Sequence, residues 1–289
     1  MKPTLIESAI VELIDAKVSA GSIQPVGGGD INQCFKVEAE GVRYFVKVNH
    51  AERFPFMFER EAEGLQLLRE ASSFIVPRTF GVSYQEDQAL LVMEYLEPSS
   101  PGKEFTRQFA HCLAELHKTE HESFGLDVDN YIGSLNQWNE PMDDWIGFFH
   151  TQRIDFQLEM AIERGHMNAA DANSFESLYG RLSEFFPEEK PSLLHGDLWS
   201  GNYAVVSGGK PSIFDPAVYY GHRYMDLGMM QLFGGFDRSI FDHYHEMFPL
   251  ESNWEEGTQI ANLYPLLVHV NLFGESYVQQ VRSIVRRFT

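Results

Sequence analysis

The pattern of hydrophobic and polar positions changes once along the chain, near residue 97. Before that point the apolar spacing alternates between the period of a helix and the period of a strand. It predicts a helix, three strands, a second helix and two strands, at residues 4–14, 22–26, 33–38, 42–49, 55–70, 78–84 and 89–95, respectively. This order indicates a small antiparallel sheet with one helix inserted between its third and fourth strands.

The helical period dominates after residue 97. The segment 97–102 is rich in proline, serine and glycine, which is typical of a linker. Beyond it, helices are predicted at residues 105–117, 145–164, 171–186, 225–232 and 263–288. A chain of 289 residues has room for about two domains. We therefore expect an α+β protein with an N-terminal sheet lobe, residues 1–97, and a mainly helical C-terminal lobe, residues 98–289.

The net charge of the protein excludes some classes of binding partner. The chain has 42 acidic and 22 basic residues and a formal net charge of −20. Such a field repels nucleic acid and anionic membranes. The longest apolar stretch, residues 263–273, is much shorter than the about 20 residues that span a bilayer. We expect neither a nucleic-acid partner nor a membrane.

The two cysteines, Cys34 and Cys112, are too few for a disulfide framework and are not spaced as a zinc site. The N-terminal helix contains Glu7 and Glu12 and is followed by no small-residue cleavage site, so it does not have the character of a signal peptide. These features predict a cytoplasmic protein. We expect it to act as a monomer.

The strongest chemical signal is the segment 193–202 together with 212–216. Asp197 precedes Asn202 by five residues, and Asn202 precedes Asp215 by thirteen. In a phosphotransferase loop with this spacing, the first Asp orients the attacking hydroxyl and accepts its proton, and the Asn and second Asp hold Mg²⁺ through oxygen. Either segment alone is equally typical of a turn. Their order and spacing favour a catalytic loop.

Such an enzyme also needs a lysine for the phosphates of ATP and a carboxylate that positions it. Lys47 lies in an apolar strand, and Glu61 lies on the inward face of the following helix, with Phe58 and Leu65. A carboxylate on that face is costly unless it is paired, and Lys47 is a suitable partner. By itself Lys47 would be interpreted as an ordinary edge-strand lysine. The segment from Asp197 to Asp215 reverses that preference.

Two further segments predict nucleotide contacts. Gly27, Gly28 and Gly29 lie between the first two strands, where backbone N–H groups can approach phosphates, although they do not match the G-x-G-x-x-G pattern. The last strand ends beside the linker, where we expect adenine to bind the carbonyl of Glu94 and the N–H of Leu96.

On these residues the chain resembles the fructosamine kinases, also called ketosamine kinases. This is a branch of the aminoglycoside-phosphotransferase-like group, which has the bilobal protein-kinase fold. The matching features are residues 27–32, Lys47, Glu61, and residues 194–202, 214–217, 219–223, 226–227 and 270–277. The block 194–202 is the most specific of them, because related kinases commonly share Asp197 and Asn202 without Trp199. The resemblance covers nearly the whole length.

The resemblance implies that ATP phosphorylates the 3-hydroxyl of a ketosamine, such as a fructosamine or ribulosamine. The 3-phosphate then eliminates and frees the amine, which makes the enzyme a deglycation kinase. Several members have a cysteine after the glycines where this chain has Asp30. Cys34 lies in the next strand, so we expect a small buried residue there and carry over no redox switch.

Three residues are candidates for the substrate side. The indole of Trp199 is expected to face the sugar, with burial in the helical lobe as the alternative. His222 and Arg223 follow the Asp215 segment and are expected to shape the substrate pocket. A structural pairing of Arg223 with Asp226 is an equally good interpretation.

Two other functions compete with the ketosamine kinase. The first is a kinase for another small alcohol or amine, such as an aminoglycoside, choline or a sugar; Trp199 and residues 271–277 argue against it. The second is an inactive nucleotide-binding interaction module. Its difficulty is that such a module has no need for the full catalytic set, which is Lys47, Glu61, Asp197, Asn202 and Asp215.

Overall fold

The computed structural model describes residues 2–27 and 31–289. The chain divides into two compact units. Unit 1 comprises Met1–Phe105 with Ala204–Pro216, and unit 2 comprises Thr106–Tyr203 with Ala217–Thr289. The expected lobe boundary at residue 97 stays a prediction, because the compactness of a unit does not test where an independently folding domain ends.

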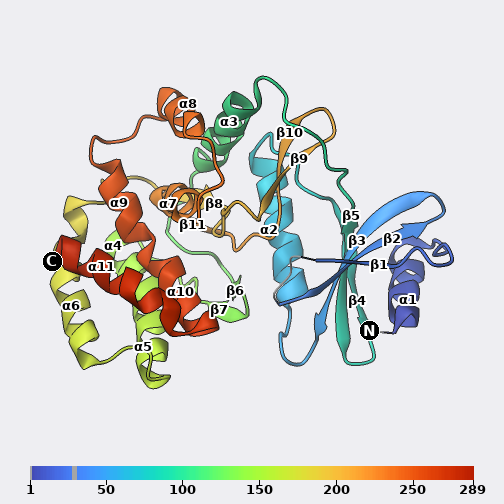
Figure 1. Cartoon of the computed structure of the whole chain (residues 1–289), viewed down its shortest axis with the longest axis horizontal. Helices are drawn as coiled ribbons and strands as arrows, with labels where there is room; N and C mark the ends of the chain where they lie inside the picture. Colours follow the sequence, from blue (N-terminus) through green and yellow to red (C-terminus); the bar gives the residue numbers. More distant parts are fainter. Residues whose placement is uncertain (1, 28–30) are drawn as a thin grey trace. The chain divides into compact units, whose positions relative to one another are not determined.

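Unit 1 is built around a five-stranded antiparallel sheet (Figure 1). Its strands are β1 (Gln24–Val26), β2 (Gln33–Ala39), β3 (Val42–His50), β4 (Thr79–Gln85) and β5 (Gln88–Glu94). Their order across the sheet is β1-β2-β3-β5-β4. The five strands and the antiparallel sheet predicted from the alternating pattern are confirmed.

The two faces of β3 contact different helices. Helix α1 (Pro3–Ile14) packs against β4 and β5, and its Ile6 and Ile10 share a core with Val46 and Val48. Side chains alternate along a strand, so Lys47, between those two valines, points to the opposite face. Helix α2 (Met57–Ala71) also packs against β4 and β5. The hydrogen bond between Lys47 and α2, described below, shows that α2 lies on the Lys47 side.

A hairpin from the middle of the chain completes unit 1. Strands β9 (Tyr203–Val206) and β10 (Lys210–Ile213) pair with each other. Ile75 forms a parallel bridge with Ser212, and its N–H donates to the carbonyl of Pro211. Asp215 follows this hairpin directly. Although Asp215 is far from Lys47 in sequence, both residues therefore belong to unit 1.

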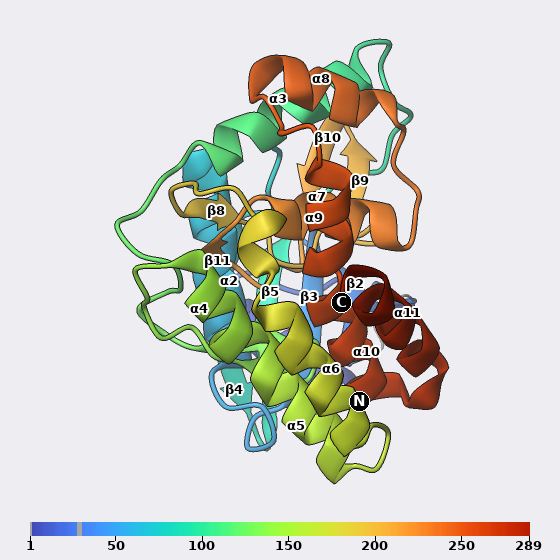
Figure 2. The same ribbon diagram turned by 90° about the vertical axis from the view of Figure 1, so that its left-hand side faces the viewer.

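Unit 2 is mainly helical, as expected. Its helices are α3 (Phe105–His117), α4 (Trp145–Phe148), a π-helix (Phe149–Asp155), α5 (Phe156–Glu163), α6 (Ala169–Tyr179), α7 (Tyr224–Leu232), α8 (Ser239–Met247), α9 (Trp254–Ala261), α10 (Leu263–Phe273) and α11 (Val278–Phe288). Short 3₁₀ turns cover Leu182–Glu184 and Glu275–Tyr277. Helix α10 packs against α5 and α11, and α11 packs against α6 (Figure 2).

Unit 2 also contains two small pairs of strands. Strands β6 (Asn130–Ile132) and β7 (Leu135–Gln137) form a hairpin, and β8 (Ser192–Leu194) pairs with β11 (Tyr219–Gly221). The apolar period did not predict the strands from β6 to β11, nor α8 and α9. Each is short, and short segments take much of their structure from tertiary contacts.

Three predicted helices are interrupted. The helix predicted over residues 171–186 ends at Tyr179, and a 3₁₀ turn follows at Leu182–Glu184. Residues 145–164 contain the π-helix instead of a uniform α-helix. Residues 263–288 are two helices, because Gly274 has φ of +88° and ends α10. An apolar stripe continues past such a break, which is why the periodicity alone predicted one helix. Among the residues that the structure describes, no helix has both the length and the apolar character needed to cross a bilayer.

Candidate active site

The first group of candidate residues gathers around Lys47 in unit 1. The Nζ atom of Lys47 donates to Oε1 of Glu61 at 2.6 Å and to Oδ1 of Asp215 at 2.5 Å. Lys47 is only 3% exposed. Its expected pairing with Glu61 is confirmed. The contact between Lys47 and Asp215 was not expected, since these residues are 168 positions apart.

The two carboxylates stabilise the positive charge of Lys47. Burial works to lower the pKa of Lys47, but the carboxylates of Asp215 and Glu61 outweigh it and raise that pKa. The lysine is therefore a fixed positive charge at neutral pH. A raised lysine pKa contributes stability that is lost only as the pH rises through it, far above neutrality.

Asp215 has an unusual backbone. Its φ is +57°, in the left-handed region that residues other than glycine rarely adopt. Such a conformation costs on the order of 1–3 kcal/mol and is found most often at functional sites. Its side chain is 42% exposed, so its carboxylate is accessible to a ligand as well as to Lys47.

The second group lies in unit 2, on the loop that follows β8. Gly196 has φ of +82°, and a Cβ there would lie 2.0 Å from the carbonyl oxygen of Ala217. Only glycine fits such a position. The Nδ2 atom of Asn202 donates to the backbone oxygen and to Oδ2 of Asp197, both at 2.9 Å. The loop thus brings together Asp197 and Asn202, two of the predicted residues.

Asp226, at the start of α7, holds the backbone of this loop in place. Its carboxylate accepts from the backbone N–H of His195 at 2.7 Å and of Gly196 at 2.9 Å. Nε2 of His117 lies 3.3 Å from the same carboxylate. Burial works to raise the pKa of Asp226, but its interactions with His117 and His195, including the hydrogen bonds from the His117 ring and the His195 N–H, outweigh it and lower that pKa. Asp226 therefore stays ionised although it is fully buried.

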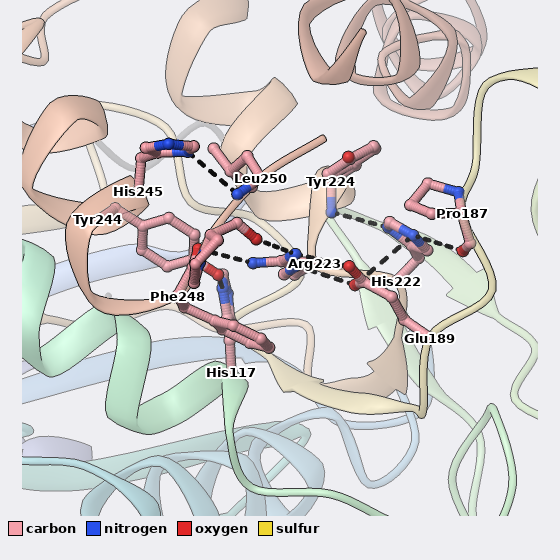
Figure 3. Close-up of polar contacts among 11 residues, drawn as sticks. His117, Pro187, Glu189, His222, Arg223, Tyr224, Tyr244, His245, Phe248 and Leu250 are labelled. Atoms are coloured by element: carbon pink, nitrogen blue, oxygen red, sulfur yellow. Dashed lines mark hydrogen bonds and ion pairs between the residues drawn. The ribbon is translucent and has the colours of Figure 1, made fainter. Parts of the chain in front are cut away.

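Asp226 also corrects one interpretation, because it is not the partner of Arg223. The guanidinium of Arg223 pairs with the carboxylate of Glu189, with Nε at 2.8 Å from Oε2 (Figure 3). It also donates to the carbonyls of Phe248 and Pro249. The sequence offered no signal for Glu189, which lies in an irregular segment.

His222 is equally enclosed. Its Nε2 lies 3.2 Å from the carbonyl of Pro187, and its Nδ1 accepts from the N–H of Tyr224 (Figure 3). Burial lowers the pKa of His222 to about 4. His222 is 1% exposed and Arg223 is 2% exposed. With their polar atoms directed to buried partners, these side chains support the interior of unit 2, and their role in shaping a substrate pocket stays a prediction.

Trp199 is accessible. It is 37% exposed and contacts Phe233 edge to face, with ring centroids 6.5 Å apart. Its indole lies over Gly201, where a Cβ would be 2.2 Å from the ring. The alternative of burial in the helical lobe is therefore wrong, and a sugar-facing indole stays a prediction.

The remaining nucleotide candidates are described only in part. Gly27 has open space where a Cβ would stand. Gly28 and Gly29 lie outside the described residues. Glu94 is the last residue of β5, and Leu96 follows in the linker. Their contacts to adenine stay predictions.

Cys34 lies directly opposite Lys47 in the pairing of β2 with β3. Its thiol is partly buried, and burial raises its pKa to about 11 in spite of the opposing charge of Lys47. The thiol is therefore protonated at neutral pH and is a poor nucleophile.

The donor atoms suit a hard cation. Asp215 offers an accessible carboxylate. The amide nitrogen of Asn202 donates to Asp197, which orients the side-chain oxygen of Asn202 away from that carboxylate. Carboxylate and amide oxygens are the ligands that Mg²⁺ prefers, so the residue types fit this ion.

Comparison with known proteins gives a consistent result. A family model described as Fructosamine kinase matches residues 3–289. The chain is 40% identical over 279 residues to a protein of Enterococcus faecium named "Probable ketoamine kinase", covering 96% of this chain and 98% of that one. A protein of the same name from Vibrio parahaemolyticus is 40% identical over 266 residues, covering 91% and 90%.

Solved structures agree. One from Thermobifida fusca, whose name describes it as a fructosamine-3-kinase, superposes with a TM-score of 0.88 at 33% identity and covers 97% of each chain. The aminoglycoside phosphotransferase APH(4)-Ia superposes with a TM-score of 0.63 at 15% identity over the full length of both chains. This second likeness shows the fold alone.

The sheet of unit 1 and the helices of unit 2 are those of the protein-kinase-like phosphotransferases. The predicted α+β fold is confirmed. With the family model matching nearly every residue, the chain belongs to the fructosamine kinase family. It is an enzyme of the phosphotransferase class.

Proposed function

We propose that this protein uses ATP with Mg²⁺ to phosphorylate the 3-hydroxyl of ketosamines, such as fructosamines or ribulosamines. The product then loses its 3-phosphate by elimination and releases the free amine, so the reaction removes glycation. The observation that carries the proposal is the buried Lys47, held by Glu61 and Asp215. Positioning a fixed cation for phosphates in this way is what phosphoryl transfer requires.

In this proposal unit 1 binds the nucleotide. Lys47 contacts the α- and β-phosphates, and Glu61 keeps its ammonium group in place. Gly27, Gly28 and Gly29 supply backbone N–H groups to the phosphates, and the backbone of Glu94 and Leu96 binds adenine. Some structural neighbours are named as complexes with AMP-PNP or ADP, which supports a nucleotide as ligand.

Unit 2 contributes the groups for the acceptor. Asp197 orients the 3-hydroxyl and accepts its proton as the oxygen forms a bond to the γ-phosphorus and the bond to the ADP oxygen breaks. Asn202 holds the carboxylate of Asp197 through its amide nitrogen. Asn202 and Asp215 are the residues that would hold Mg²⁺, which would neutralise charge on the phosphates. Trp199 would cover one face of the sugar.

We also propose that the protein works as a monomer in the cytoplasm, where ATP is available. Both cysteines, Cys34 and Cys112, are free thiols, which supports a reducing compartment. A sedimentation measurement of the purified protein tests the first statement, and fractionation of cells tests the second.

An ADP-release assay with Mg·ATP tests the main proposal against four acceptors: a ribulosamine, a fructosamine, an aminoglycoside and choline. We expect turnover with the ketosamines alone, and a product whose phosphate is released in alkali. Turnover with only the aminoglycoside or choline would move the chain to the alternative small-molecule kinase. A lack of turnover with all four acceptors would favour the inactive nucleotide-binding module.

A further inference from the structure

A chain of buried polar side chains runs through unit 2 toward the backbone that supports Asp197. Its members are between 0% and 6% exposed: Asn130, Gln137, Asn139, Arg153 and Tyr264. A buried polar group without a partner costs about 1–3 kcal/mol, so the bonds among these five are needed for any of them to be buried. The backbone groups that these five side chains bind indicate the role of the network.

The β6–β7 hairpin reaches the backbone just beyond Asp215. Asn130 and Gln137 lie directly opposite each other in the hairpin. Nε2 of Gln137 donates to the carbonyl of Ala217 at 3.0 Å and to Oδ1 of Asn130 at 2.8 Å. Nδ2 of Asn130 donates to the carbonyl of Val218 at 2.8 Å. Two successive carbonyls are thus fixed by two side-chain amides.

Ala217 in turn fixes the loop that carries Asp197. Its N–H donates to the carbonyl of His195 at 2.9 Å. Its own carbonyl fills the space where Gly196 has no Cβ. Because the two backbones are in direct contact, a displacement of Ala217 displaces His195 and Gly196, and these residues immediately precede Asp197.

Arg153 lies at the other end of this network of buried side chains. Its Nη2 donates to Oδ1 of Asn139 at 2.8 Å, and Nδ2 of Asn139 donates to Oδ1 of Asn130 at 3.0 Å. The guanidinium lies 3.9 Å from the ring centroid of Tyr219, which stabilises a buried cation. Arg153 belongs to the π-helix, an uncommon turn that is frequent at functional sites.

Tyr264 adds a hydroxyl donor to the network. Its hydroxyl donates to Oε1 of Gln137 at 2.8 Å. Burial is the main cause that raises the pKa of Tyr264, and the charge of Asp197 adds to it. Tyr264 therefore remains a neutral hydrogen-bond donor.

We infer that Gln137 and Asn130 are positioning residues for phosphoryl transfer, and that Arg153 anchors them. They hold Ala217 and Val218, and through Ala217 they fix the geometry of the loop that presents Asp197 to the acceptor hydroxyl. The inference rests on the proposed role of Asp197. A misplacement of about 1 Å in a catalytic group can cost about 10²-fold in rate, so the effect is measurable.

The test is the variant Gln137→Glu. It preserves the shape of the side chain and the acceptor for Tyr264, but a carboxylate oxygen then faces the carbonyl of Ala217. We expect kcat to fall at least tenfold while the KM for ATP stays within twofold. We also expect faster amide hydrogen exchange in residues 193–199, measured by mass spectrometry without substrate. Gln137→Met, which removes the donor without adding a charge, serves if the first variant does not fold.

The matched control is Asn271→Asp, also buried in unit 2. Nδ2 of Asn271 donates to the carbonyl of Gln157 at 2.8 Å and to its Oε1 at 2.9 Å. The control therefore loses the same kinds of hydrogen bond as the Gln137 variants, in bonds that do not reach the Asp197 loop. We expect its kcat within twofold of wild type and unchanged exchange in residues 193–199.

The outcomes separate the two proposals. If the wild-type protein phosphorylates no ketosamine, the proposed function fails. The inference fails on its own if the folded Gln137 variants keep wild-type exchange in residues 193–199. It also fails if they keep wild-type kcat, or if Asn271→Asp loses as much kcat at an equal melting temperature, because the effect would then be general destabilisation.

Discussion

The two groups of candidate residues are held in place by different forces. In unit 1, Lys47 is fixed by direct ion pairs to Glu61 and Asp215. In unit 2, Asp197 is fixed by an amide from Asn202, on a loop whose backbone is held by Asp226. One group depends on opposite charges and the other on hydrogen bonds to the backbone.

The difference matches what the proposed function requires of each group. A cation for phosphates must remain charged in a buried place, and paired carboxylates ensure that. A carboxylate that accepts a proton must instead keep its charge available to the substrate, so rigid neutral donors suit it better than a cation. The buried cations of unit 2, Arg223 and Arg153, are directed to other partners.

The largest expected effect comes from Asp197→Asn. The change preserves the shape of the side chain but removes the proton acceptor, so kcat should fall by about 10³-fold, within the range known for general bases. The affinity for Mg·ATP should stay within a few fold, because the proposed function assigns Asp197 neither to the nucleotide nor to Mg²⁺. Steady-state kinetics and equilibrium titration measure the two quantities. A comparable loss of nucleotide affinity would contradict the role assigned to Asp197.

Next is Lys47→Met, which leaves Glu61 buried without its cation. Breaking a buried pair costs about 3–5 kcal/mol, and we expect the lower end because Asp215 is partly exposed. Unlike Asp197→Asn, this variant should lose both nucleotide affinity and stability, measured by titration and urea unfolding. Lys36→Met on β2, whose ammonium lies over the ring of Tyr95, is the control and should change stability by less than about 1 kcal/mol. Equal losses would refute the special position of Lys47.

Arg223→Met tests whether Arg223 is a structural partner of Glu189 or a residue of the substrate pocket. It leaves Glu189 without its bidentate partner, so the free energy of unfolding should fall by about 3 kcal/mol, while the KM for the ketosamine stays within twofold. Lys190→Met breaks an exposed pair with Glu120 and should cost less than about 1 kcal/mol. A tenfold rise in KM without a loss of stability would instead support the predicted substrate role of Arg223.

The last prediction concerns pH, and its effect is spread over the interval from pH 6.5 to pH 4. Burial lowers the pKa of His222 from 6.5 to about 4. As the pH falls, His222 therefore becomes protonated in the unfolded chain before it does in the folded protein. The contribution of neutral His222 to stability is complete above pH 6.5 and is lost toward pH 4, with a slope of about 1.4 kcal/mol per pH unit. Urea unfolding between pH 7 and pH 4 should show a shallower loss for His222→Phe. Parallel curves would count against a buried neutral imidazole.

Much of the fold followed from periodicity, because most of its elements bury one face. The strands of unit 1 alternate and α3 has a clear apolar stripe, so their bounds were predicted within two residues. The same pattern missed the π-helix and the break at Gly274, since neither changes which residues are apolar. For the site, local spacing predicted the loop of Asp197 and Asn202, which is built from neighbours in sequence.

The sequence by itself determined the residue types that the chemistry requires and the family to which the chain belongs. Only the tertiary structure decided which of those residues meet. It joined Lys47 to Asp215, paired Arg223 with Glu189, and placed Gln137 against Ala217. The physical reason is that such contacts join segments far apart in the chain. Their partners are chosen by packing and by the need to satisfy buried polar groups, and local patterns do not encode either one.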